Sequence, residues 1–332
     1  MMRQQRGGTG SLWDRYWGNW GKGVPGRTGT FCFITIALLL FLSPPAFSAP
    51  DKIKIAVTTA TFASMAQEIV GERAQIHAIA APHQNIHYYQ PTPKDVVKVK
   101  KADVLIYGGL DLEMWLDPLL VAAGNQKFLG EATASINLSK GIEPLELPTS
   151  LSRAQGDIHR YGNPHHWMDP ENAKQAARNI ADGLSRLYPD FTEEFHQNAE
   201  ALVGRIDEKM RDWENRLGPF KGTGIVTYHK NWSYFAKHFG LEIVGELEPK
   251  PGIPPTPKHL AELEKLMKEK GAKLVIKESY QESRTPKKVA EETGAKVLTL
   301  AQFVGETKEG GDYLSMMEEN VKQIEEALSL SS

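Results

Sequence analysis

Strand-like and helix-like segments alternate along this chain in two separate blocks. The alternation stops before residue 190 and restarts after residue 220. Such alternation indicates parallel sheets that are covered by helices on both faces. We therefore predict an α/β fold with two (β/α)4-type lobes of similar build. The expected strands are 53–57, 75–80, 104–107 and 133–138 in the first block, and 224–228, 241–247, 273–277 and 296–300 in the second.

One long helix is predicted between the two blocks. Apolar residues recur at steps of three and four along 190–217, and Gly218 with Pro219 ends the pattern. Asp190 followed by Glu193 is a variant of the capping box and predicts the start of the helix. A helix of this length extends about 40 Å. It would join the lobes rigidly, so that they can rock slightly but cannot close like a wide hinge.

The N-terminal segment has the three parts of a secretory signal peptide. Residues 1–30 carry five basic residues and one acid, Asp14, and an apolar run follows at 31–42. Proline and small residues come next, and they predict cleavage after Ser48. The apolar run is shorter than the roughly 20 residues that span a membrane, so a retained anchor is the less favoured alternative.

Composition limits the partners and the chemistry of the exported protein. Cleavage would remove Cys32, the single cysteine, which leaves no disulfides and no thiolate metal ligands. The net charge of −2, from 39 basic and 41 acidic residues, gives no reason to expect a nucleic-acid partner. We expect a soluble monomer in a bacterial periplasm. Its expected parts are a signal peptide (1–48), an N-terminal lobe (49–189), the linking helix (190–217) and a C-terminal lobe (218–332).

Three segments that lie far apart each place a histidine beside aromatic, proline or glycine residues. Their histidines are His87, His165 and His229. Imidazole is a usual protein ligand for zinc, copper, nickel and iron. All three histidines lie in predicted loops, and ligands of open parallel sheets bind beyond the carboxyl ends of the strands. Because the first two belong to the first block and His229 to the second, we predict one metal site between the lobes.

The mature chain resembles, along its length, the zinc- and manganese-binding solute receptors of bacterial ABC transporters. The resemblance implies two (β/α) lobes, a long backbone helix and a metal ion buried at the lobe interface. It also implies a receptor, not an enzyme, that captures Zn²⁺, or alternatively Mn²⁺, and delivers it to an ABC permease in the inner membrane. The matching motifs are a histidine followed by Pro-Thr-Pro at 87–93, His-x-Trp-x-Asp-Pro at 165–170, a histidine opening an aromatic helix at 229–235, and the segments 248–257 and 313–320.

The sequence departs from the family pattern in two places. Many members have an aspartate ligand after the last strand, where this chain has Leu300. Glu278, which directly follows the preceding strand, is the predicted substitute. Its alternative role is to hydrogen-bond a ligand histidine, with water completing the ligand shell. The loop at 140–164, which is rich in histidine in many zinc members, contains only His159 here, so a metal-collecting role is reduced.

The other histidines have less specific signals. We expect His166 to face solvent, because the family motif uses His165. His83 is a weaker rival of His87 in the same loop. The remaining aromatic and histidine positions are expected to pack around the site (Tyr89, Trp167, Trp232) or to be structural or solvated (His77, His196, His238, His259).

Zinc is the predicted ion, although other ions and other functions remain as alternatives. Three neutral imidazoles and one oxygen suit the tetrahedral shell of Zn²⁺, whereas Mn²⁺ prefers oxygen ligands and the general affinity order favours copper. A secreted zinc hydrolase, with Glu278 as general base, is one alternative function. The chain has no His-Glu-x-x-His helix to support it. An adhesin built on the same fold is the other alternative.

Overall fold

A computed structural model describes residues 52–129, 134–149 and 159–330, and residues 51–332 form one compact unit. The predicted signal peptide and its cleavage point lie outside the described residues. Within the described ranges, no helix combines the length and the apolar character needed to cross a membrane.

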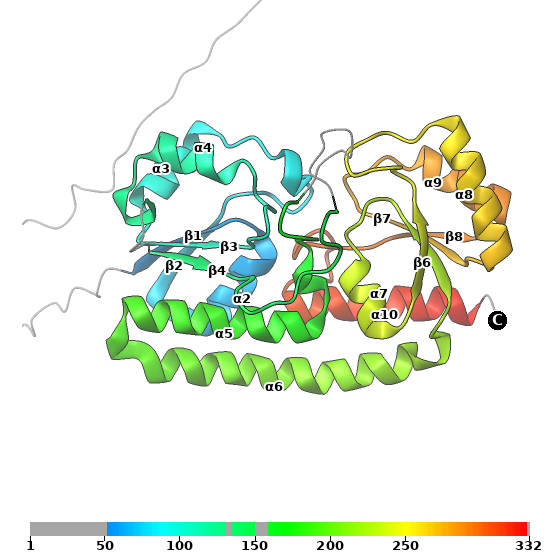
Figure 1. Ribbon diagram of the computed structural model, residues 1–332. Coiled ribbons are helices and arrows are strands. Elements are labelled where there is room, and N and C mark those ends of the chain that lie inside the picture. The colour runs from blue at the N-terminus through cyan, green and yellow to red at the C-terminus, as the bar shows by residue number, and fades with distance from the viewer. Residues whose placement is uncertain (1–51, 130–133, 150–158, 331–332) are drawn as a thin grey trace, which may run out of the picture. The chain divides into compact units, whose positions relative to one another are not determined.

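Two parallel four-stranded sheets form the frame of the molecule (Figure 1). Their strand orders are β2-β1-β3-β4 and β6-β5-β7-β8, so the second sheet repeats the order of the first. The predicted α/β fold with two parallel sheets is confirmed. The strands are β1 (Ile53–Val57), β2 (Ala74–Ala78), β3 (Val104–Tyr107), β4 (Ser135–Asn137), β5 (Gly224–Thr227), β6 (Glu242–Glu246), β7 (Leu274–Lys277) and β8 (Lys296–Thr299).

Helices connect the strands and cover the sheets (Figure 1). In each sheet the strand order changes direction once, between β1 and β3 and between β5 and β7, and a ligand crevice forms beyond the carboxyl ends at such a point. The helices are α2 (Ala60–Val70), α3 (Pro93–Lys101), α4 (Leu116–Ala123), α5 (Pro170–Leu187), α6 (Thr192–Leu217), α7 (Ser233–Phe239), α8 (Pro257–Lys270), α9 (Arg284–Thr293) and α10 (Tyr313–Ser329).

Several residues of the histidine motifs form helix starts. Thr92 and Asp95 form a capping box at the start of α3, which has Pro93 in its first turn. The Asp169 side chain accepts a hydrogen bond from the Glu171 backbone and caps α5 in the same way. The Pro-Thr-Pro and Asp-Pro parts of the motifs therefore end the histidine loops and fix where the following helices begin.

The long helix α6 has 26 residues, which corresponds to about 39 Å. The predicted capping box at its start is wrong. Residues Pro189–Phe191 form a short 3-10 turn, and Phe191 occupies the cap position without a side-chain hydrogen bond. The Glu193 side chain accepts a hydrogen bond from Gln197 instead of reaching back to the cap. The acidic first turn still interacts favourably with the helix dipole.

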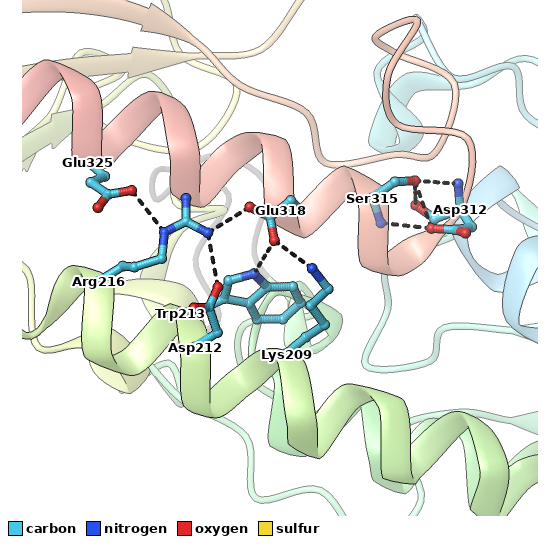
Figure 2. A network of polar contacts seen from close by, with 8 residues as sticks. All are labelled: Lys209, Asp212, Trp213, Arg216, Asp312, Ser315, Glu318 and Glu325. Carbon is cyan, nitrogen blue, oxygen red and sulfur yellow. Dashed lines mark hydrogen bonds and ion pairs between the residues drawn. The ribbon is translucent and has the colours of Figure 1, made fainter.

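The last helix, α10, lies along α6 and also contacts α2 from the first half of the chain. Figure 2 shows the polar network that joins α6 and α10. Glu318 on α10 accepts hydrogen bonds from Trp213 Nε1, Lys209 and Arg216 on α6. Arg216 also donates to Glu325, about two turns further along α10. The C-terminal helix is therefore tied to the helix that links the two sheets.

The main hydrophobic core is continuous between the two halves of the chain. It includes Phe62 and Trp167 from the first half, Trp213 from α6, and Phe235 and Tyr313 from the second half. Trp167 Nε1 donates to the Gln302 carbonyl, and Tyr313 Oη donates to the Trp167 carbonyl. The two halves therefore share packed side chains as well as the linking helix.

Candidate metal centre

Three of the predicted site residues meet in space. The ligand nitrogens of His87, His165 and His229 all lie within 4.8 Å of one another, and all three residues are buried. Their ring centroids are 5.0 Å (His87–His165), 5.2 Å (His87–His229) and 5.7 Å (His165–His229) apart. Converging imidazoles at these distances could hold one transition-metal ion.

His87 lies in a short 3-10 turn (Ile86–Tyr88) after β2. Its backbone N–H donates to the Asn85 side chain, which caps the turn. Trp115 Nε1 donates to the Ile86 carbonyl, and the Tyr89 ring packs edge-on against Trp115. Aromatic residues of the motif thus hold the loop that carries the histidine.

His165 precedes the 3-10 turn His166–Met168, which leads into α5. Its backbone N–H donates to the Asn163 side chain, and its ring lies 5.3 Å from the Trp167 ring. The expectation that His166 faces solvent is wrong. The His166 side chain is fully buried, with its Nε2 3.0 Å from the Gly108 carbonyl. Burial lowers the pKa of His166 to about 4, so this ring is neutral and structural.

His229 follows β5 and opens the segment that leads into α7. Its Nδ1 lies 2.8 Å from Glu248 Oε2, and this oxygen also accepts a hydrogen bond from the Gly252 backbone. A carboxylate that holds one ring nitrogen leaves the other nitrogen free to bind a metal and makes it more basic. The motif at 248–257 contains Glu248, but no local pattern in it predicts this contact with His229.

The two histidines from the first half are held in their neutral form. Burial lowers the pKa of His87 and His165 well below the usual 6.5, and the neighbouring histidines add to this shift. Neutral imidazole is the form that binds metal ions. These two rings are therefore in their metal-binding protonation state at neutral pH.

Glu278 is fully buried but lies outside the group of three histidines. Its Oε1 accepts a hydrogen bond from Trp232 Nε1 at 2.6 Å. Burial raises the pKa of Glu278 to about 8. Leu300, which stands where many family members have an aspartate, is buried in the main core. His83 lies away from the three histidines, with its Nδ1 3.3 Å from Ser279 Oγ.

A pocket of about 440 Å³ opens at the histidines. His165 and His229 line it, together with His159, Asn163 and Lys230. Two of the three converging histidines therefore face a cavity, whereas His87 does not line it.

Comparison with known proteins agrees with this geometry. The family model for "Zinc-uptake complex component A periplasmic" (ZnuA) matches residues 55–327. The iron-binding protein YfeA of Yersinia pestis is 30% identical over 283 residues, which cover 82% of this chain and 85% of YfeA. The zinc-binding protein AdcA of Streptococcus pyogenes is 26% identical over 288 residues, or 83% of this chain. The chain spans only 56% of AdcA.

Solved structures share the fold. A crystal structure of ZnuA matches with a TM-score of 0.71 and 23% identity, over 83% of this chain and 99% of ZnuA. The solute-binding protein FpvC of P. aeruginosa in complex with Ni²⁺ matches with a TM-score of 0.72 and 21% identity, over 85% of this chain and 98% of FpvC. The chain belongs to the family of periplasmic zinc-uptake component A, whose members are metal-binding receptors of transport systems and not enzymes.

Proposed function

We propose that this protein is a periplasmic receptor that captures Zn²⁺ and delivers it to an ABC-type permease in the inner membrane. His87, His165 and His229 are the proposed ligands. The observation that supports this best is the meeting of three buried imidazoles from both halves of the chain. We also infer that the receptor acts as a monomer and that its signal peptide is cleaved.

The donor set supports zinc over manganese. The group of histidines supplies nitrogen, which suits Zn²⁺, Ni²⁺ and Cu²⁺, whereas Mn²⁺ prefers an oxygen-rich shell. The relatives do not share a single metal, since AdcA is described as zinc-binding and YfeA as iron-binding. The three rings therefore argue against Mn²⁺, and the choice of Zn²⁺ among the nitrogen-preferring ions rests on the tetrahedral shell that three imidazoles and one oxygen suit.

Glu278 remains the predicted fourth ligand, with water as its alternative. A carboxylate bound to the ion would reduce the charge of the site from +2 to +1, which favours burial of the ion. In the described structure Trp232 Nε1 donates to Oε1 of Glu278, so Oε2 is the oxygen that could bind the ion while this hydrogen bond is kept.

A metal competition experiment tests the proposed function. Residues 49–332, which contain the whole compact unit, are refolded without metal and offered equal concentrations of Zn²⁺, Mn²⁺, Fe²⁺, Ni²⁺ and Cu²⁺. Mass spectrometry of the washed protein should find one Zn²⁺ per chain. Preferential retention of Mn²⁺ or Fe²⁺ would contradict the proposal, and retention of no ion would favour the adhesin alternative. His229→Ala is the matched control and should retain little metal.

A further inference from the structure

A tight turn lines the pocket at the candidate metal centre. It covers residues 250–253, and the Ile253 N–H closes it by donating to the Lys250 carbonyl at 2.9 Å. Pro251 at the second position and Gly252, with a φ of 75°, at the third are the features of a type II turn. The hydrogen bond that closes such a turn does not use the N–H of its third residue, so this group can donate elsewhere.

The Gly252 N–H donates to a carboxylate that also contacts a proposed metal ligand. Its acceptor is Glu248 Oε2, at 2.9 Å, and the same oxygen lies 2.8 Å from His229 Nδ1. Both side chains are largely buried, with 10% of His229 and 17% of Glu248 exposed. One carboxylate oxygen therefore joins the imidazole to the 250–253 turn.

The backbone of the second sheet places Glu248 beside the ring. Beyond the ends of β5 and β6, the Leu247 N–H still donates to the Thr227 carbonyl, and the Glu248 N–H donates to the Tyr228 carbonyl. These hydrogen bonds continue the pairing of the two strands up to the residue before His229. The position of Glu248 is therefore set by the sheet.

The shared oxygen determines which nitrogen of His229 carries a proton. A carboxylate oxygen can only accept, so Nδ1 is the N–H group and Nε2 is the nitrogen left for an ion. An ion bound to Nε2 withdraws electron density from the ring, so Nδ1–H becomes a stronger donor to Glu248. A more firmly held carboxylate also holds the Gly252 N–H more firmly.

We propose that Glu248 is a positioning residue that couples ion binding at His229 to the order of the 250–253 turn. This rests on the proposed function and adds a way in which occupancy of the site changes the loop that lines the pocket. The coupling is reciprocal, so a change that opens the turn also weakens the hold of His229 on the ion. The same contact therefore favours binding while the turn is formed and release when it opens.

Amide exchange at Gly252, measured by NMR on residues 49–332 with and without zinc, tests this directly. The segment 249–255 has only three amide protons, at Lys250, Gly252 and Ile253, because its other residues are prolines. One equivalent of Zn²⁺ should slow exchange at Gly252 by about tenfold or more, since the bound ion suppresses opening of the turn.

Glu248→Ala removes the shared oxygen. Its zinc affinity in a chelator competition should fall roughly 10–100-fold, as is typical when a group that orients a ligand is lost. Saturating zinc should no longer slow exchange at Gly252. Long-range ¹H–¹⁵N spectra of the metal-free proteins should show a mixture of the two neutral His229 tautomers in this variant and only the Nδ1–H tautomer in the unchanged protein.

Glu248→Gln is the conservative variant, and Glu291→Gln, at an exposed position on α9, is the control. Glutamine keeps an oxygen that can accept both hydrogen bonds, so Glu248→Gln should restore the single tautomer and part of the zinc-dependent slowing. Glu291→Gln should behave as the unchanged protein does.

Equal exchange at Gly252 with and without bound zinc would overturn the proposal, as would full zinc-dependent slowing in Glu248→Ala. The first of these results needs no variant, so it decides the question even if Glu248→Ala fails to fold. Failure of the proposed function would differ, because the unchanged protein would then retain no ion and no histidine ring would shift on addition of zinc.

Discussion

At the scale of residues, burial prepares two of the three imidazoles for a cation. His87 and His165 carry no positive charge at neutral pH, because burial keeps the pKa of both rings well below the usual range. Glu248 contacts Nδ1 of His229, which leaves Nε2 of that ring for the proposed ion. The proposed site would therefore offer an ion nitrogen ligands that are already oriented.

Single alanine substitutions test the three proposed ligands. His87→Ala, His165→Ala and His229→Ala each remove one of only three or four bonds to the ion, so each should weaken zinc affinity by more than the roughly 10–100-fold typical of an indirect effect. Chelator competition measures the affinity. Circular dichroism of the metal-free proteins controls for folding, and near-wild-type affinity in a folded variant would remove that histidine from the site.

The Glu278→Gln substitution tests the predicted carboxylate ligand. If Glu278 binds the ion, the variant loses a charged ligand and zinc affinity should fall by more than about 100-fold. A change of less than tenfold would place Glu278 outside the ligand shell.

Glu278 should also control how the stability of the metal-free protein depends on pH. Its folded-state pKa of about 8 lies above the usual value of 4.5, so between these values the folded state binds a proton that the unfolded state lacks. Its contribution is therefore fully present below pH 4.5 and is lost as pH rises toward 8. Urea unfolding of Glu278→Gln from pH 5 to 8 should lose less stability with rising pH than the unchanged protein; parallel curves would contradict this.

The sequence identified the three histidines because each lies in a motif with aromatic residues and prolines. The motif distinguished His165 from His166, but it could not show that His166 is buried, because the contact of its ring with the Gly108 carbonyl joins residues 58 positions apart. Contacts of this kind come from tertiary structure and not from local pattern.

At the scale of elements, a proline predicted the start of a helix better than a pair of polar residues with capping-box spacing did. Proline fixes the backbone of a first turn, so the starts of α3 and α5 follow from Pro93 and Pro170. Asp190 and Glu193 matched a cap pattern, but the preceding Pro189 begins a 3-10 turn and moves the start of α6 to Thr192. The strand order within each sheet also could not be predicted from alternation alone.

Glu318 is the central acceptor between α6 and α10, and its removal tests that contact. Its burial opposes ionisation, but hydrogen bonds from Arg216, Trp213 and Lys209 outweigh burial and lower its pKa to about 2. The stabilisation is therefore present above pH 4.5 and is lost as pH falls toward 2. Glu318→Gln should reduce the free energy of unfolding by about 1–2 kcal/mol at pH 7. Urea titration measures this, with the exposed Glu291→Gln on α9 as the control that should change little.

At the scale of the whole molecule, the candidate site connects parts of the chain that the long helix separates in sequence. His87 and His165 precede α6, whereas His229 follows it. The shared core and the α6–α10 network already hold these parts together without an ion. Metal binding should therefore suppress local opening of the loops that carry the three histidines. It should leave α6 and α10 unchanged.

Hydrogen exchange measured by mass spectrometry tests this distribution of stability. Zinc should slow exchange in the peptides that contain residues 85–89, 161–168 and 228–232, because an ion that bridges them suppresses local opening. The peptides of α6 should exchange equally slowly with and without zinc, since packing and the contacts of Arg216 protect them in both states. The His229→Ala variant should lose the zinc-dependent protection in all three loops. Without His229, an ion could bind only the two histidines that precede α6 and could not bridge them to the loop that follows it. Zinc-dependent protection of α6 itself would instead show that the linking helix changes with the ion, and the rigid connection between the two sheets would then be wrong.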